Sequence, residues 1–126
     1  MSTPATKRAL SSPMKQVVLG KPIKIDRERV FVNPPRIHIG SGDSQLKTIQ
    51  WVNHTGDVVW IWLPSAHNYL NGEPKDFLKP YELANGAEKS FTVEDHPVKG
   101  YYEYNVYCKA IDGYAEGNSA PGVDCP

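Results

Sequence analysis

The sequence predicts a single all-β domain in which two antiparallel sheets pack as a sandwich. The 126 residues suit one domain with one hydrophobic core. Eleven prolines and ten glycines divide the chain at short intervals, as expected for short strands joined by turns. Between them, apolar and polar residues alternate with the period of two that marks a strand, and no internal repeat or heptad pattern is present.

Residues 1–15 are predicted to form a flexible, polar N-terminal arm, and residues 16–126 the sandwich domain. The arm lacks the apolar core of a secretory signal, so the chain would be cytoplasmic if Met1 is its natural start. If a signal has been removed, the localisation stays open. No run of about 18 apolar residues predicts a membrane-spanning helix, and no membrane insertion is expected.

The first half of the domain shows three strand regions. The stretch 16–25 is apolar but broken at Gly20, and 30–39 alternates apolar and polar residues around Pro34 and Pro35. Because proline cannot donate to a ladder, that strand must bend at the prolines or switch sheets. The segment 46–53, "LKTIQWVN", is the strongest alternating strand.

The second half begins with "VVWIWLP", residues 58–64, which is apolar on both faces and is therefore expected to be buried between two layers. Residues 64–86 form a long irregular region, predicted to carry a short helix or a functional loop. Strands follow at 87–93 and 101–108. In the latter, Tyr102, Tyr104, Val106 and Cys108 share one face. The tail is rich in turns, with room for one more short strand.

The order of these features resembles the cupredoxin family over roughly residues 22–110. The motifs that carry the resemblance are Phe31 to Asn33, Gly42-Asp43, Trp51 with Asn53, Gly86 with Phe91 and Val93, and Gly100 with Tyr102 and Tyr104. Each motif is generic for β-sandwiches, and only their order and spacing give the resemblance its weight. It implies a Greek-key sandwich of seven or eight strands.

The same resemblance defines what a copper-binding member needs. A type 1 site takes two imidazoles, a thiolate and a weak axial ligand that is often methionine. The family supplies one histidine a few residues after the Trp-x-Asn strand end, and a second, usually with a methionine, shortly after the cysteine. Here His54 follows Asn53 directly, and neither histidine nor methionine follows Cys108. We therefore expect no copper ligands, no cofactor and a metal-free member of the family.

Cys108 and Cys125 have two interpretations. A disulfide between them would tie the tail to the preceding strand and favours an oxidising compartment, whereas free thiols favour the cytoplasm. A catalytic Cys108 would require a histidine close in space, His54, His67 or His96, because none is near it in sequence. No pair of histidines has a spacing typical of a metal site.

The aromatic residues are expected to fill the core, but a domain of this size cannot easily bury every ring of "VWIWLP". We therefore predict a binding surface around Trp60, Trp62, His67 and Tyr69, next to the 64–86 loop, since long loops on rigid sandwiches commonly carry recognition. Asn53 also begins an N-x-T sequon, relevant only to a eukaryotic secreted protein.

The formal net charge is zero and the basic residues are dispersed, so no nucleic-acid partner is expected. No catalytic motif is present. The sequence therefore predicts a non-catalytic, metal-free cupredoxin-like binding module for an unknown protein or small molecule, with its oligomeric state unspecified. The first alternative is a copper-binding electron carrier, and the second is a small enzyme that uses Cys108 with a nearby His67 or His96.

Overall fold

The protein is an all-β domain, as predicted from its sequence. The computed structural model describes residues 14–20, 23–24, 28–71, 79–116 and 119–126. The strands in these residues are β1 (Met14–Leu19), β2 (Ile23–Lys24), β3 (Glu28–Arg29), β4 (Val32–Asn33), β5 (Arg36–His38), β6 (Thr48–Asn53), β7 (Val59–Trp62), β8 (Tyr81–Leu83), β9 (Glu88–Thr92), β10 (Gly100–Glu103), β11 (Asn105–Cys108), β12 (Gly113–Tyr114) and β13 (Gly122–Cys125). Two 3-10 turns accompany them, η1 (Gly42–Ser44) and η2 (Ala66–Asn68). No helix in the described residues is long and apolar enough to cross a membrane.

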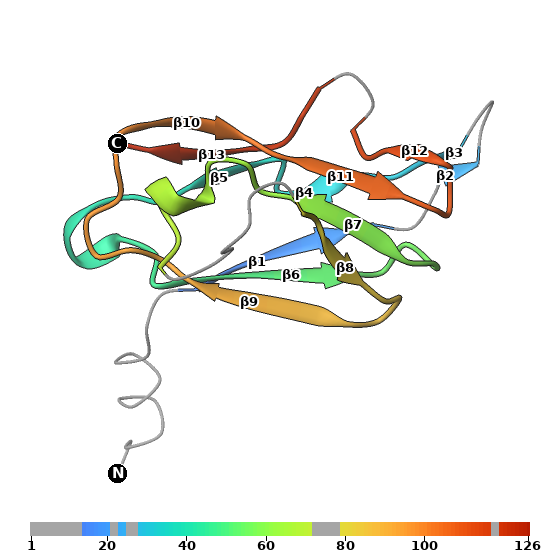
Figure 1. Cartoon of the computed structure of the whole chain (residues 1–126), viewed down its shortest axis with the longest axis horizontal. Coiled ribbons are helices and arrows are strands. Elements are labelled where there is room, and N and C mark those ends of the chain that lie inside the picture. The colour runs from blue at the N-terminus through green and yellow to red at the C-terminus, as the bar shows by residue number, and fades with distance from the viewer. Residues whose placement is uncertain (1–13, 21–22, 25–27, 72–78, 117–118) are drawn as a thin grey trace, which may run out of the picture.

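The strands form two layers (Figure 1). The lower layer has the order β4-β1-β6-β9. The upper layer consists of two sheets, β10-β13-β5 and β12-β11-β7-β8. Only Tyr104 separates β10 from β11, so these two strands run on from one another and join the two upper sheets end to end. β2 and β3 form a separate hairpin.

The chain crosses between the layers repeatedly, which places non-consecutive strands side by side. β6 pairs with β9 in the lower layer, and β7 pairs with β11 in the upper layer. The predicted interruption at Pro34 and Pro35 marks such a crossing, because β4 belongs to the lower layer and β5 to the upper layer. A strand cannot continue in one ladder through two residues that lack an N–H.

Three details differ from the sequence prediction. The sandwich is not wholly antiparallel, since β1 lies parallel to β6 and β5 parallel to β13. The described strands also outnumber the seven or eight expected, because breaks at the prolines and at Tyr104 divide longer strands. Finally, β1 begins at Met14, inside the predicted arm of residues 1–15. The first three residues of β1 are exposed, so the sequence shows no alternation of apolar and polar residues there that would predict a strand.

The core lies between the layers and centres on Trp51. Its indole is fully buried and packs edge-on against the rings of Phe91 and Tyr104, with ring centroids 5.5 Å apart in each pair. The indole N–H also donates a hydrogen bond of 3.1 Å to the Tyr104 hydroxyl. Edge-to-face ring pairs contribute about 0.5–1.5 kcal/mol beyond the area they bury. Tyr104, Val106 and Cys108 are buried on the inner face of the upper layer, as their alternation predicts.

The C-terminal end of β6 is fixed by Asn53, whose side chain is fully buried. Its Nδ2 donates to the carbonyls of Asp57 and Leu83 at 2.8 Å, and its Oδ1 accepts from the backbone N–H and the hydroxyl of Thr55. This amide therefore ties the turn after β6 to the end of β8. Because both amide protons are used and the group is buried, the sequon at Asn53 is inaccessible in the folded protein.

Candidate functional site

Of the two interpretations of Cys108 and Cys125, the structure has the free thiols, because the two cysteines lie at opposite ends of the upper layer. Cys125 pairs with Gly100 at the start of β10, whereas Cys108 is the last residue of β11. From residue 100 to residue 108, eight residues of extended chain span about 26 Å. Bridged cysteines need Cα atoms within about 7 Å. Both thiols are free and buried.

The surroundings of both cysteines keep them protonated. Burial raises the pKa of the Cys108 thiol to about 11, although a hydrogen bond with the backbone of Ala115 acts in the opposite direction. Burial, followed by the charge of Asp124, raises the pKa of Cys125 to about 11 as well. Metal ligands and nucleophiles are thiolates, so either role would first require the loss of this proton.

The residues around Cys108 do not fit a type 1 copper centre. The chain after Cys108 makes a tight turn, with Ile111 N–H donating to the Cys108 carbonyl at 3.3 Å. It then returns as β12, in which Gly113 pairs with Cys108 and Tyr114 with Tyr107. No imidazole or thioether is available in this segment. In the described residues, no three His, Cys, Asp or Glu side chains gather where they could hold a metal ion.

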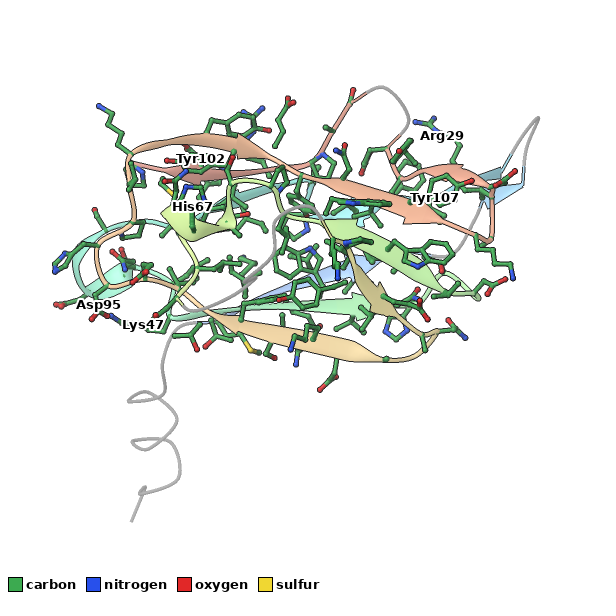
Figure 2. The ribbon with its side chains drawn as sticks, viewed as in Figure 1. Arg29, Lys47, His67, Asp95, Tyr102 and Tyr107 are labelled. Carbon is green, nitrogen blue, oxygen red and sulfur yellow. The ribbon has the colours of Figure 1, made fainter. Side chains whose placement is uncertain are left out.

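The structure also separates Cys108 from two of the histidines that an enzyme could use. His67 lies in η2, and the N–H of Val98 donates to the Asn68 carbonyl, which holds η2 beside the segment that contains His96 and leads into Gly100. Both histidines therefore lie at the Gly100 end of the upper layer. Figure 2 shows His67 beside Tyr102, far from Tyr107, the neighbour of Cys108 in β11. His54 is exposed in the turn after β6.

The four residues predicted to form one binding surface do not lie together. Tyr69 is 1% exposed and its ring stacks on that of Tyr102, so it belongs to the core and the prediction for it is wrong. Its burial follows from the 3-10 turn η2, which directs Tyr69 inward and leaves His67 exposed. Trp60 and Trp62 lie elsewhere, on β7.

β7 is buried on one face only, contrary to the expectation that both of its faces are covered. Val59 and Ile61 point into the core, while Trp60 and Trp62 are half-buried on the opposite side. The upper layer forms one side of the sandwich, and no described element packs over its outer surface (Figure 1). The tryptophans therefore face outward, which local apolar composition could not reveal.

Two tyrosines join these tryptophans on the same side of the upper layer. In the strand register Tyr107 of β11 lies opposite Trp60, and Tyr114 of β12 lies opposite Tyr107. Tyr107 is half-buried and Tyr114 is 53% exposed. We name Trp60, Trp62, Tyr107 and Tyr114 the outer aromatic face. Neither tyrosine was among the predicted binding residues, although the alternation of the strand places Tyr107 on the face opposite Cys108.

A continuous series of contacts runs across this face from one carboxylate to another. Glu82 of β8 accepts a hydrogen bond of 3.3 Å from Trp60 Nε1. The ring of Trp60 lies 5.9 Å from that of Tyr107, inclined at 48°, and the Tyr107 hydroxyl donates to Asp112. The Tyr114 ring meets that of Tyr107 edge-on at 5.3 Å. The carboxylates orient the rings by their polar ends and leave parts of the ring faces exposed to solvent.

The hydrogen bond to Asp112 is the largest influence that raises the pKa of Tyr107, followed by burial and the Asp112 charge. The phenol of Tyr107 is therefore the donor of this hydrogen bond. Asp112 has a left-handed backbone with φ of 49°, a conformation that aspartate tolerates better than most residues because of its short polar side chain. Figure 2 labels Tyr107 on β11, at the end of the sandwich away from His67.

Comparison with known proteins gives little beyond the arrangement of the chain. No protein-family model matches the sequence, and no curated protein matches it. Among solved structures the chain is similar to one described as a novel purple cupredoxin from Nitrosopumilus maritimus, with a TM-score of 0.49 and 15% identity. The alignment covers 89% of this chain and 99% of that one. The strand pairings of this chain, rather than that likeness, establish its two-layer fold.

Proposed function

We propose that this protein is a non-catalytic, cupredoxin-like binding module that works without a metal ion and recognises its partner through the outer aromatic face. The observation that carries the proposal is the group of Trp60, Tyr107 and Tyr114, which lie side by side on three neighbouring strands and remain partly open to solvent. Tryptophan and tyrosine supply much of the binding energy of protein interfaces.

The orientation of the rings supports a recognition role. Each of Trp60 and Tyr107 uses its polar atom in a hydrogen bond to a carboxylate, so its ring is held before a partner arrives. Fixed rings lose little conformational entropy on binding, which favours affinity. Rings placed only to fill the core would instead lie on the inner face, as Trp51 and Tyr104 do.

The chemistry of the cysteines favours a role without a thiolate. The pKa of each thiol is about 11, and the chain after Cys108 carries no imidazole or thioether. Copper binding would require Cys108 to lose its proton in an apolar site and to find ligands from elsewhere in the chain. Catalysis by Cys108 would require a base, and His67 and His96 lie at the opposite end of the layer.

The proposal is tested by fluorine NMR on protein labelled with 5-fluorotryptophan, which gives one signal for each of the three tryptophans. Single Trp→Phe variants assign the signals. A screen of small ligands and short peptides should yield binders that shift the signals of Trp60 and Trp62 while leaving that of buried Trp51 unchanged. Tyr114→Ser should weaken such binders, whereas Tyr101→Ser, on the same layer but outside the face, should not. Binders that act only elsewhere, or none, would refute the proposal.

Two direct measurements address the alternatives. Addition of Cu(II) to the purified protein should give neither strong visible absorbance nor stoichiometric bound metal, and either result would establish the copper carrier instead. A thiol-reactivity assay should find both cysteines slow until the protein unfolds. One fast-reacting cysteine in the folded protein would support the small enzyme.

A further inference from the structure

We propose that the outer aromatic face binds an extended, arginine-bearing segment of a partner protein. This inference rests on the proposed function and adds to it the chemistry of the partner. It depends on three properties of the face in the described part of the chain: its charge, the lack of a lysine or arginine over Tyr114, and its open shape.

The charge of the face is negative. The outward side chains of β7, β11 and β12 and of the neighbouring β8 include one carboxylate, Glu82, and no lysine or arginine among the described residues. Asp112 adds a second carboxylate beside Tyr107. Two cations lie at the edge of this group: Lys109 is exposed in the turn that follows β11, and Arg29 lies near the end of β12, since the neighbouring Val30 carbonyl accepts a hydrogen bond from Glu116 N–H. A carboxylate has about four acceptor positions, so Glu82 and Asp112 can each receive further donors while holding Trp60 and Tyr107.

Other exposed aromatic residues of this chain are covered by the chain's own cations. The guanidinium of Arg29 lies 5.2 Å from the ring centroid of Phe31, and that of Arg36 lies 4.9 Å from that of Tyr101. Phe31 and Tyr101 are 36% and 42% exposed. Tyr114 is more exposed than either, at 53%, yet no lysine or arginine of the described residues lies over it. A cation from outside would complete the pattern that the chain uses elsewhere.

The shape of the face favours a protein segment over a small molecule. Small ligands bind in concave sites that enclose most of their surface, whereas this face is the outer side of a sheet with no described element over it. An extended peptide can lie across such a surface. Nucleic acid is disfavoured, since the two carboxylates would repel phosphates.

Arginine suits this arrangement better than lysine does. Its planar guanidinium stacks on an aromatic ring while its N–H groups bind a carboxylate, and Trp60 with Glu82 and Tyr107 with Asp112 each offer both partners together. β8, which carries Glu82, and β12, next to Asp112, are three strand spacings apart, or about 14 Å. A segment crossing the strands would therefore place two arginines about four residues apart.

The experiment uses a fluorescein-labelled, nine-residue peptide of glycine, serine and threonine with arginines at its third and seventh positions. A matched peptide carries citrulline, the neutral analogue of arginine, at both positions. Binding to the full chain is followed by fluorescence anisotropy at low salt and at 0.5 M NaCl. We expect the arginine peptide to bind at least tenfold more tightly than the citrulline peptide, and added salt to reduce that difference.

The variants separate charge from ring contact. Glu82→Gln combined with Asp112→Asn keeps the shape and the acceptors of the face but removes its charge, and should weaken the arginine peptide about tenfold. Trp60→Ala should weaken both peptides, as should Tyr114→Ala, whose exposed ring can be removed with little effect on folding. Tyr101→Ala is the control, because its ring is already covered by Arg36.

The possible outcomes distinguish the preference for arginine from the more general proposal that the outer aromatic face is a binding surface. If both peptides bind equally and both lose affinity in the Trp60 and Tyr114 variants, the face is a binding surface but its preference for arginine is refuted. If the arginine peptide binds and the face variants leave its affinity unchanged, the proposed function and the inference both fail. If the arginine peptide does not bind at millimolar concentration while the fluorine NMR screen finds other ligands on the face, only the inference fails.

Discussion

Replacement of Asn53 by alanine should be among the most destabilising single substitutions outside the apolar core. The Asn53 side chain is fully buried and makes four hydrogen bonds, two as donor and two as acceptor. Alanine removes all four at once. Thr55 can compensate in part, because its hydroxyl already lies 2.9 Å from the Asp57 carbonyl. The Leu83 carbonyl and the Thr55 N–H both lose the Asn53 side chain from buried positions.

The magnitude follows from those two atoms. A buried donor or acceptor left without its partner costs about 1–3 kcal/mol, so two of them predict a loss of roughly 2–6 kcal/mol in the free energy of unfolding. Domains of this kind have about 5–15 kcal/mol in total. A loss near the middle of the range would lower the melting temperature by roughly 10–20 °C.

The assay is equilibrium unfolding in urea, followed by tryptophan fluorescence and by far-ultraviolet circular dichroism. The matched control is Asn85→Ala, because the Asn85 Oδ1 accepts a hydrogen bond of 2.9 Å from Gly56 N–H at an exposed position. Water can replace that partner, so a loss below about 1 kcal/mol is expected. If Asn53→Ala costs no more than the Asn85 variant, the buried amide does not stabilise this end of the sandwich as argued.

Three further predictions concern the buried and the outward-facing groups. Tyr104→Phe removes the hydroxyl that accepts the hydrogen bond of the Trp51 indole N–H in the core, and should lower the free energy of unfolding in urea by about 1–3 kcal/mol. An unchanged urea midpoint would show that another group replaces the hydroxyl. The unfolding free energy should fall as pH rises from about 9 to 11, because both buried thiols have folded-state pKa values raised from 9.0 to about 11 and the unfolded chain therefore loses these protons first. The buried tyrosines Tyr69 and Tyr104 also contribute to this pH dependence. Replacement of either cysteine by alanine should reduce the fall of the unfolding free energy with pH, and an unchanged fall would contradict the role given to the thiols. Asp112→Asn should lower the pKa of the Tyr107 phenol, measured by NMR titration with carbon-13-labelled tyrosine, since the bond to the carboxylate is the main cause that raises it.

Alternation along the chain predicted which side chains of a strand such as β11 share one face. The inner positions of β11, including Val106 and Cys108, and the sheet switch at Pro34 and Pro35 are both in the structure as expected. These features depend on neighbouring residues only: the pleat sends successive side chains to opposite faces, and proline removes a ladder donor wherever it stands. Local rules of this kind can be applied without knowledge of the partner strand.

The features that the sequence left open or predicted wrongly are those in which a residue's surroundings depend on distant segments. Cys125 lies far from Cys108 because β13 pairs with the beginning of β10, and the sequence does not encode that register locally. Tyr69 is buried because it stacks on Tyr102, which comes from a separate strand. The strand 58–64 was expected to be covered on both faces from its composition, yet the layer order leaves open the side that carries Trp60 and Trp62. Each of these features therefore required knowledge of which strands pair and which layers meet.

The segment that follows Cys108 lies between the buried thiol and the proposed binding surface. In a copper-binding cupredoxin, as the resemblance implies, this segment would direct ligands toward the cysteine. Here the turn folds outward, and β12 pairs Tyr114 with Tyr107 on the exposed side of the sheet. Asp112 adopts a left-handed backbone in that turn, which costs on the order of 1 kcal/mol, and its carboxylate reaches the Tyr107 hydroxyl. Tyr114 and Asp112 of this segment therefore belong to the surroundings of the outer aromatic face, while the Cys108 thiol is buried on the inner side of the sheet.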